Sequence, residues 1–210
     1  MVDVNGNSST CASTVTVIDS IDPTPLCQNL TVYLDSLGST SITTGAVNNG
    51  STDICGISNL SLSVSAFNCS NVGGNTVVLT VTDVNANTAT CSATVSVLDT
   101  IDPAITCPGN QVLFADSALC GAIAQWNVPN TLENCAVDTV FSNHPSGAVF
   151  PIGTTTVVYS VIDVNANSSI CAFTISVDPV PLQVVLSSPL QGCGYHLACA
   201  LDSTANIVSY

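Results

Sequence analysis

The residues of this chain best suited to chemistry are aspartates that recur in a fixed setting. Asp3, Asp83 and Asp163 each open the pattern Asp-Val-Asn-(Gly or Ala)-Asn, and each lies 80 residues from the next. Carboxylate and amide oxygens are the ligands that Ca²⁺ prefers in proteins. The same residue types at turn positions also bond to their own backbone. The pattern therefore has two interpretations, a calcium ligand set or a structural turn, and it lacks the glutamate and the spacing of an EF-hand loop.

Cysteine is the second reactive side chain that recurs. Of the eleven cysteines, Cys11, Cys91 and Cys171 repeat at the same step of 80 residues. Such density indicates an oxidising, extracellular compartment and a disulfide framework. Two complete copies hold four cysteines each, and we expect two bridges per copy, although three connectivities remain open. The predicted disulfide cysteines are Cys27, Cys55, Cys69 and Cys91 in one copy and Cys107, Cys120, Cys135 and Cys171 in the other.

Three cysteines lie outside the complete copies. Cys11 is equivalent to Cys91, so its partner is expected in an upstream copy. Cys193 and Cys199 are expected to pair with each other or within a downstream copy, and a zinc site with His196 between them is the alternative.

The charge balance excludes several partners. The chain has no lysine or arginine among 210 residues and 14 acidic residues, which gives a net charge of −14. Nothing can neutralise nucleic acid phosphates or anionic lipid headgroups. Hydrophobic residues make up 46% of the chain, which favours a packed core over disorder. No stretch is long and apolar enough to predict a membrane span.

The repeat step defines the organisation that positions these residues. Motifs that recur at a constant step indicate tandem copies of one domain. We expect a closing hairpin of a truncated upstream repeat at 1–19, complete repeats at 20–99 and 100–179, and the start of a truncated downstream repeat at 180–210. Long β-branched runs predict strands at 76–82, 89–97, 154–162 and 169–177. Shorter strands are expected at 30–34, 40–44, 57–66, 111–115, 121–128 and 137–142. Many short strands in about 80 residues predict an all-β fold of tandem antiparallel sandwiches, immunoglobulin-like or fibronectin type III-like.

The residues also resemble a known family. Pro-Ala-Ile-Thr-Cys-Pro (103–108), Trp126, Asn134-Cys135 and the run 150–163 are similar to the hyalin repeat (HYR) domain, and 20–99 is similar to a variant found in large surface proteins of gliding Bacteroidota. The tail after Leu186 resembles SprB-like gliding-motility adhesins. The resemblance implies export by the type IX secretion system and gliding motility. Glu133 stands where the family usually has Asp, and Ala86 and Ala166 replace a turn glycine that is kept as Gly6.

A sandwich of this kind brings acidic residues together at one end. The closing hairpin turn, the incoming linkers at 19–23 and 99–103, and the loops that hold Asp53 and Glu133 should share that end. The hypothetical calcium sites at the domain junctions consist of Asp22, Asp53 and Asp83 in one copy and of Asp102, Glu133 and Asp163 in the next. Ca²⁺ is the only cofactor expected, and ordinary turn chemistry remains the alternative.

Six aspartates precede Ser or Thr in a pattern that resembles the O-glycosylation sequon of Bacteroidota. The candidate acceptors are Ser20, Ser36, Thr100, Ser117, Thr139 and Ser203. The same dipeptides are also common in turns.

The inventory predicts no enzyme, because no cation is available for an oxyanion, and His144 and His196 lie in no catalytic motif. We expect a structural stalk segment of a long adhesin filament at the cell surface, extracellular and associated with the outer membrane. Its partners would be neighbouring repeats and extracellular surfaces or glycans, without nucleic acid and without direct membrane insertion. The alternatives are a carbohydrate- or protein-binding module and a subunit that polymerises by strand complementation.

Overall fold

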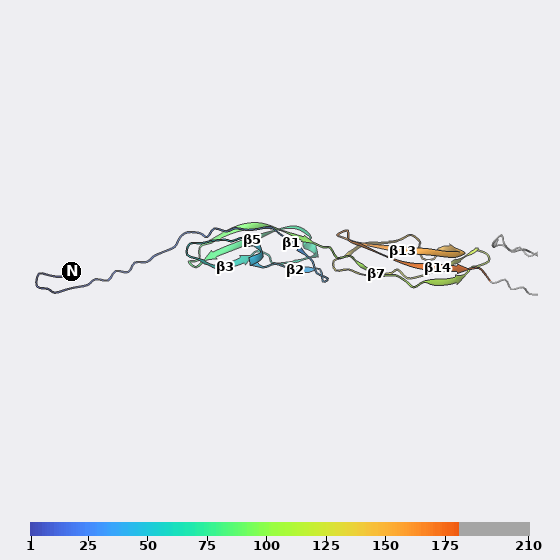
Figure 1. The fold of residues 1–210 in the computed structure, drawn as a ribbon, viewed down its shortest axis with the longest axis horizontal. Coiled ribbons are helices and arrows are strands. Elements are labelled where there is room, and N and C mark those ends of the chain that lie inside the picture. Colours follow the sequence, from blue (N-terminus) through green and yellow to red (C-terminus); the bar gives the residue numbers. More distant parts are fainter. Residues whose placement is uncertain (181–210) are drawn as a thin grey trace, which may run out of the picture. The chain divides into compact units, whose positions relative to one another are not determined.

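The computed structural model describes residues 1–180, and the chain divides into two compact units, Met1–Asp99 and a second that begins at Thr100. Both units are built from strands (Figure 1). The first holds β1 (Leu30–Tyr33), β2 (Ser39–Ser41), α1 (Thr44–Val47), β3 (Ile57–Leu62), β4 (Ala66–Asn68), the 3₁₀ turn η1 (Cys69–Asn71), β5 (Gly73–Asp83) and β6 (Thr88–Leu98). The second holds β7 (Ala104–Thr106), β8 (Gln111–Phe114), β9 (Gly121–Ile123), β10 (Asn130–Leu132), β11 (Val137–Ser142), β12 (Val149–Pro151), β13 (Gly153–Asp163) and β14 (Ser168–Asp178).

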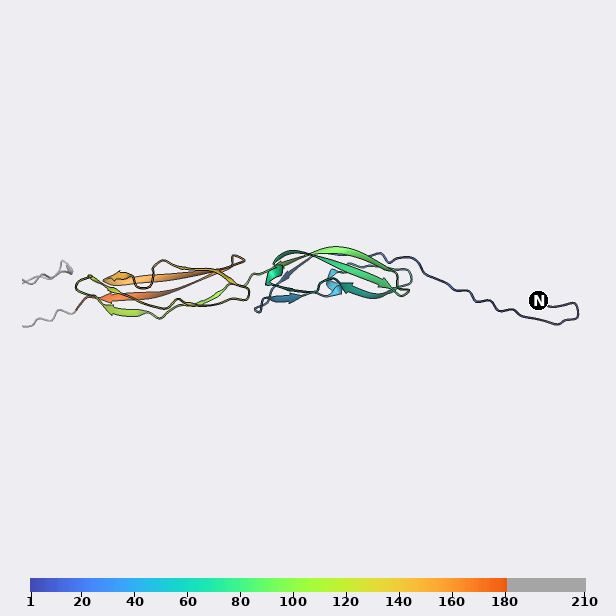
Figure 2. The same ribbon diagram turned by 180° about the vertical axis from the view of Figure 1, so that it is seen from behind.

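The same large sheet forms in both units. Its strand order is β1-β6-β5-β3 in the first and β8-β14-β13-β11 in the second. Short pairs complete each sandwich: β2 with β4 in the first unit, and β7 with β10 and β9 with β12 in the second. The long hairpin of each unit can also be followed from behind (Figure 2). The predicted fold class, tandem all-β sandwiches, is therefore confirmed.

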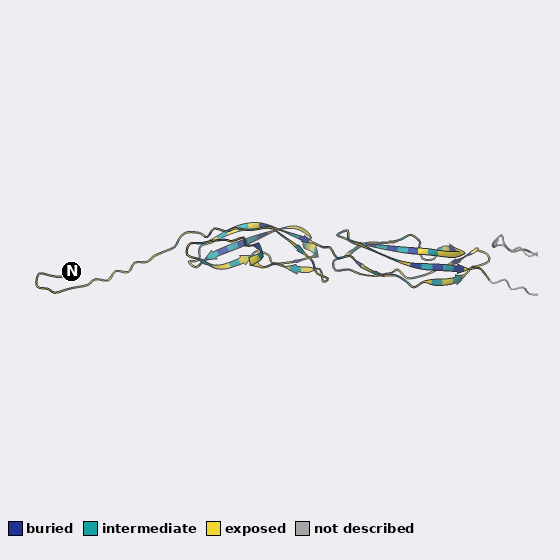
Figure 3. Cartoon of the chain, in the orientation of Figure 1, coloured by how far each residue is buried: buried dark blue, intermediate teal, exposed yellow. Residues whose placement is uncertain are grey.

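The long hairpins β5–β6 and β13–β14 hold the core because their sequences alternate. β-branched residues at every second position place one row inside, since successive strand side chains point to opposite faces. Val77, Leu79 and Val81 of β5 are fully buried, as are Val95 and Val97 of β6. This alternation is visible along the strands in Figure 3. In the second unit the equivalent core includes Phe150, Val157, Phe173 and Ile175.

Each sandwich contains one disulfide at an equivalent position, which we call the staple. Cys27, before β1, is bonded to Cys91 on β6, and Cys107 is bonded to Cys171 on β14. Each bond spans 64 residues, with Cα–Cα distances of 5.9 and 5.7 Å. The bond ties the segment that leads into the unit to the long hairpin.

Each unit has two poles, which we name by the path of the chain. The proximal pole carries the turn of the long hairpin, at 84–87 or 164–167, and the distal pole is the end where β6 or β14 finishes. Cys55 lies at the proximal pole of the first unit, because Ile57 pairs with Asp83. Cys69 lies at the distal pole, because it precedes Gly73, which pairs with Val97.

This separation contradicts the prediction of two bridges per unit. The eleven residues of β5 separate the poles by about 33 Å, because a strand rises about 3.3 Å per residue. Even if the chain ran straight back from both ends, Cys55 and Cys69 would stay about 12 Å apart. A disulfide requires Cα atoms within about 7 Å. Cys55 accordingly has a free, exposed thiol, and its predicted bridge within the unit is wrong.

The second unit repeats the arrangement. Cys135 lies at its proximal pole, two residues before Val137, which pairs with Asp163. Cys120 lies at its distal pole, because the adjacent Gly121 bridges to Asp116 beside Ala115, whose N–H donates to Asp178. These two cysteines therefore cannot form a bridge within the unit either.

Residues 1–18 hold a first copy of the closing hairpin. The turn at 3–7 is formed, with the Asp3 N–H donating to the Asn7 carbonyl at 2.8 Å. Val15 and Val17 are 81% and 89% exposed, whereas the equivalent Val95 and Val97 are fully buried. The segment equivalent to the buried strands β6 and β14 therefore forms no strand here, and no sheet packs against it among residues 1–180.

Details of the strands differ from the prediction. β1 and β8 pair in parallel with β6 and β14, so the sandwich is not antiparallel throughout. The strand expected at 121–128 ends at Ile123, and the short strands β7, β10 and β12 were not expected. Within residues 1–180, no helix is long and apolar enough to cross a membrane. The expectations for Cys193, His196, Cys199, Ser203 and the downstream repeat fall outside the described residues.

Candidate functional site

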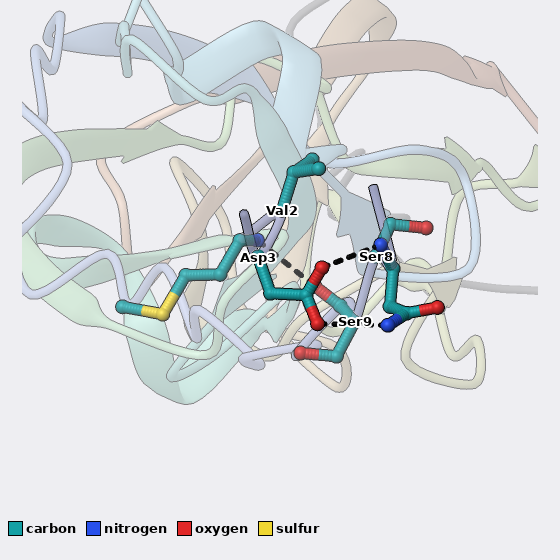
Figure 4. Close-up of a pocket in the computed structure, with 6 residues that line it drawn as sticks. Val2, Asp3, Ser8 and Ser9 are labelled. Atoms are coloured by element: carbon teal, nitrogen blue, oxygen red, sulfur yellow. Dashed lines mark hydrogen bonds between the residues drawn. The ribbon is translucent and has the colours of Figure 1, made fainter. Parts of the chain in front are cut away.

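The recurring Asp-Val-Asn-x-Asn pattern forms one turn three times. One carboxylate oxygen of Asp83 accepts hydrogen bonds from the N–H groups of Asn85 and Asn87, both at 2.8 Å, and the other accepts from the Asn87 side-chain amide at 2.8 Å. Asp163 accepts the same three bonds at the same distances. Figure 4 shows the first copy, in which both carboxylate oxygens of Asp3 accept hydrogen bonds. The turn is thus stabilised by hydrogen bonds between the aspartate and the asparagines of the same pattern.

The turn needs a left-handed residue at its fourth position. Gly6, Ala86 and Ala166 hold that position with φ of 84°, 73° and 72°. Only Gly adopts this region without steric cost, because Cβ approaches the following carbonyl in L-residues. The two alanines therefore store strain that Gly6 avoids.

Burial and hydrogen bonding act in opposite directions on the pKa of Asp83. The side chain of Asp83 is 1% exposed and that of Asp163 is 2% exposed. Burial alone would raise the pKa of the Asp83 carboxyl, but the side-chain and backbone amides of Asn87 and the neighbouring N–H groups hold that pKa below its usual value. Because the donors favour the charged form, the turn depends on an ionised carboxylate.

A group of metal-ligand residues forms at the proximal pole of the first unit. Asp19, Asp53 and Cys55 each offer one ligand atom, and these atoms lie within 4.8 Å of one another. The Asp53 carboxylate accepts from the N–H groups of Cys55 and Gly56 at 2.7 and 2.9 Å. The hydrogen bond from the Cys55 thiol to the Asp19 carboxylate raises the pKa of that thiol, and burial and the nearby acids raise it further. The thiol is therefore mostly protonated at neutral pH, and the thiolate is a minor species.

A second group consists of Asp99, Glu133 and Asp163, whose carboxylate oxygens also lie within 4.8 Å of one another. Asp99 and Asp163 are buried, and Glu133 is half-buried. One oxygen of Glu133 accepts from the Asn134 N–H at 2.8 Å, and the other, Oε2, is buried without a hydrogen-bond partner. Carboxylate oxygens held this close repel one another, and a bound cation would relieve that repulsion.

The sequence prediction located these acidic groups only in part. Asp53, Glu133 and Asp163 belong to these groups, but Asp22, Asp83 and Asp102 lie outside both, Asp83 buried in its own turn and Asp22 and Asp102 exposed. Asp19 and Asp99, three residues earlier, take their places. Pro23 and Pro103 are buried, so they anchor the chain just after Asp22 and Asp102 and leave these side chains in solvent. The sequence signal was available, because Asp19 and Asp99 lie in the same linker motif.

The candidate modification positions are accessible. Ser20, Ser36, Thr100, Ser117 and Thr139 are all exposed. The aspartates before three of them are engaged in turns: Asp19 accepts from Ile21 N–H, Asp35 from Leu37 N–H and Asp116 from Ala118 N–H. The Asp-Ser dipeptides at these places thus have a structural role, whether or not they are modified.

The single tryptophan belongs to the core of the second unit. Trp126 donates its indole N–H to the Tyr159 hydroxyl at 2.8 Å, and its ring packs against Phe150 and Phe173 with centroid distances of 5.9 and 5.2 Å. A hollow of about 370 Å³ lies beside it, lined by polar and apolar residues of three segments, Thr106–Gly109, Gln111 and Trp126–Asn130. Because the indole is engaged on one edge and one face, it is not a free stacking platform.

Comparison with known proteins gives one family and several relatives. Residues 98–177 match the family described as HYR domain. Hyalin of Strongylocentrotus purpuratus is 29% identical over 199 residues, which cover 89% of this chain and 17% of hyalin. Sushi, von Willebrand factor type A, EGF and pentraxin domain-containing protein 1 of Mus musculus is 29% identical over 137 residues, 63% of this chain and 4% of that protein. The chain therefore spans less than a fifth of these curated relatives.

Solved structures that match parts of this chain include titin domains z1z2 in complex with telethonin, with a TM-score of 0.34 and 12% identity over 77% of this chain and 99% of that one. Protocadherin gamma C5 EC1-3 has a TM-score of 0.32 and 12% identity over 74% and 68%. The HYR match is to a domain family and not to a known enzyme family. The second unit thus matches the HYR domain directly, and the similarity to hyalin over most of the chain supports HYR repeats as its organisation.

Proposed function

We propose that this segment is a structural stalk within a long extracellular adhesion protein. The observation that carries the proposal is the identical staple, Cys27–Cys91 and Cys107–Cys171, placed at the same strand positions of two sandwiches. A bond across 64 residues keeps most of each unit closed even when its strands separate. Such a unit resists extension, which a stalk under tension requires.

The charge of the chain supports this role. The chain has a net charge of −14 and no lysine or arginine, so its charged side chains at neutral pH are acidic. Like-charged segments repel one another, which opposes collapse and self-association. The disulfides also fit an oxidising compartment outside the cell.

The alternative, a carbohydrate-binding module, has less support. Sugar rings bind well to an aromatic face, and the only tryptophan is packed against Phe150 and Phe173. Exposed Phe114 and Phe141 lie on β8 and β11, at opposite edges of their sheet, so they form no joint platform. One observation supports strand complementation by another subunit: Val15 and Val17 of the first hairpin copy are exposed.

Calcium binding at the acidic groups is a second part of the proposal. Its support is the close approach of Asp99, Glu133 and Asp163 and the buried, unbonded Oε2 of Glu133. Calcium requires six to eight oxygens, so backbone carbonyls and water would complete the shell. We expect CaCl₂ at millimolar concentration to raise the Tm and Glu133→Gln to remove that increase. An equal rise with MgCl₂, or none, would contradict calcium binding.

The finer predictions remain predictions. Gliding motility, type IX secretion, association with an outer membrane and O-glycosylation at the Asp-Ser/Thr sites come from the sequence resemblance alone. Intact mass and peptide mapping of the natural protein test the glycans. Hexose on peptides that contain Ser36 or Thr139 would support modification, and unmodified peptides at all exposed candidates would contradict it.

The stalk is tested by removing one 80-residue step from the natural protein. We expect the filament to shorten in electron micrographs by about 33 Å, the length of one sandwich between its poles. Adhesion measured at low shear should persist, because the binding surface lies elsewhere. Loss of adhesion together with unchanged filament length would identify the repeat as the binding module instead.

A further inference from the structure

The two cysteines outside the staple have a regular placement. Each sandwich carries one at its proximal pole, Cys55 or Cys135, and one at its distal pole, Cys69 or Cys120. The staple occupies the other two cysteines of the unit. Since the poles are separated by about the length of an eleven-residue strand, neither proximal cysteine can bond to the distal cysteine of its own unit.

The proximal position nevertheless takes part in a disulfide in one unit. Cys135 is disulfide-bonded. Cys107 and Cys171 are bonded to each other, and Cys120 lies at the opposite pole. The partner of Cys135 therefore lies outside the cysteines of its own sandwich. Cys55 occupies the equivalent position in the first unit, two residues before the strand that pairs with the hairpin end.

We propose that Cys55 is a cross-linking site, which forms a disulfide with a distal-pole cysteine of another repeat. Its thiol is free and exposed, and it sits on a loop fixed by the hydrogen bonds that Asp53 accepts. The repeat architecture supplies a cysteine at the distal pole of each complete unit, the chemical partner that this position requires. The array then carries a covalent link at its poles in addition to the backbone.

The bond forms by thiol–disulfide exchange with a low-molecular-weight disulfide such as oxidised glutathione. Two cysteine thiols lose two protons and two electrons and become one S–S bond. The glutathione disulfide takes up those protons and electrons and leaves as two glutathione thiols. An extracellular compartment supplies such an oxidant.

Disulfide mapping of the natural protein tests the proposal. Free thiols are blocked with N-ethylmaleimide at collection, and the unreduced protein is digested with chymotrypsin, because trypsin has no site in these 210 residues. We expect the Cys55 peptide to be linked to a cysteine peptide from outside residues 20–99. A link to Cys27, Cys69 or Cys91, or a maleimide on Cys55, would overturn the proposal. Intact mass with and without reduction separates a partner in the same chain from one in a second chain.

A variant of the 210-residue chain gives an independent test. Cys55→Ser should change the thermal midpoint of the first unit far less than loss of its internal bridge does, because serine can keep the hydrogen bond to Asp19 and no disulfide within the sandwich is lost. Cys27→Ser is the matched comparison, since it removes the staple of the same unit. If Cys55→Ser lowers the midpoint as much as Cys27→Ser, Cys55 belongs to the internal framework and the proposal fails. The readout does not involve adhesion, so it is separate from the stalk function.

Discussion

Removal of the Cys107–Cys171 staple should cost the second unit a large part of its stability. The bond closes a loop of 64 residues. In the chain-entropy model, such a loop removes about 14 cal/mol/K from the unfolded state, or about 4 kcal/mol at 25 °C. Small domains have about 5–15 kcal/mol in total. The Cys107→Ser/Cys171→Ser double variant is therefore expected to be marginally folded.

The assay can address this unit alone, because Trp126 is the only tryptophan in the chain. Urea unfolding followed by Trp126 fluorescence should move to a midpoint lower by about 3–4 M, given a slope of about 1 kcal/mol/M for a domain of this size. Cys11→Ser is the control, since Cys11 is exposed and free. A loss below about 1 kcal/mol, or an equal loss in the control, would refute the view that the staple constrains the unfolded chain.

Four further results are expected. Asp163→Ala should cost about 2–3 kcal/mol in urea unfolding, because three amide donors lose their charged acceptor, whereas Asp3→Ala in the exposed first copy should have no effect on either unit. Ala86→Gly should raise the stability of the first unit by about 1 kcal/mol in urea unfolding by removing left-handed strain, whereas the control Ala89→Gly, on strand β6, should lower it. Gly121→Ala should destabilise the second unit in thermal unfolding, because the added Cβ would lie 2.4 Å from the Phe150 carbonyl oxygen. The free energy of unfolding of the first unit should decrease as the pH falls below about 4, because the pKa of Asp83 is lower in the folded state than in the unfolded state. The stabilisation by the charged carboxylate is complete above the unfolded-state pKa and is lost as the pH falls through the folded-state pKa. Asp83→Asn should flatten this pH dependence in urea unfolding.

The regular parts of the fold could be predicted because their signals are local. The β-branched runs at 76–82 and 154–162 lie inside β5 and β13, and the alternation alone assigns their buried faces. The short strands β7, β10 and β12 have three residues each, too few for a periodic signal. Their pairing depends on contacts between segments distant in sequence.

The candidate site was harder to predict for the same reason. The strand order was enough to place Asp53 at the proximal pole of the first unit, and Glu133 and Asp163 at the proximal pole of the second. Whether Asp19 or Asp22 joins them depends on which linker residues are anchored, and buried Pro23 settles that in the folded chain. The spacing of the cysteines shows which positions are equivalent in the two copies, but it carries no information on the distances between them. That Cys55 and Cys69 lie at opposite poles could therefore be learned only from the fold.

Single-molecule extension of the chain tests the stapled stalk most directly. A reduced 80-residue unit should lengthen by about 250 Å when it unfolds, since extended chain spans up to about 3.6 Å per residue and the folded sandwich about 33 Å. With the staple closed, 64 residues stay inside the loop, and the unit should lengthen by only about 30 Å. Short steps under oxidising conditions that become long on adding a reductant would support the account. Long steps in both conditions would contradict it.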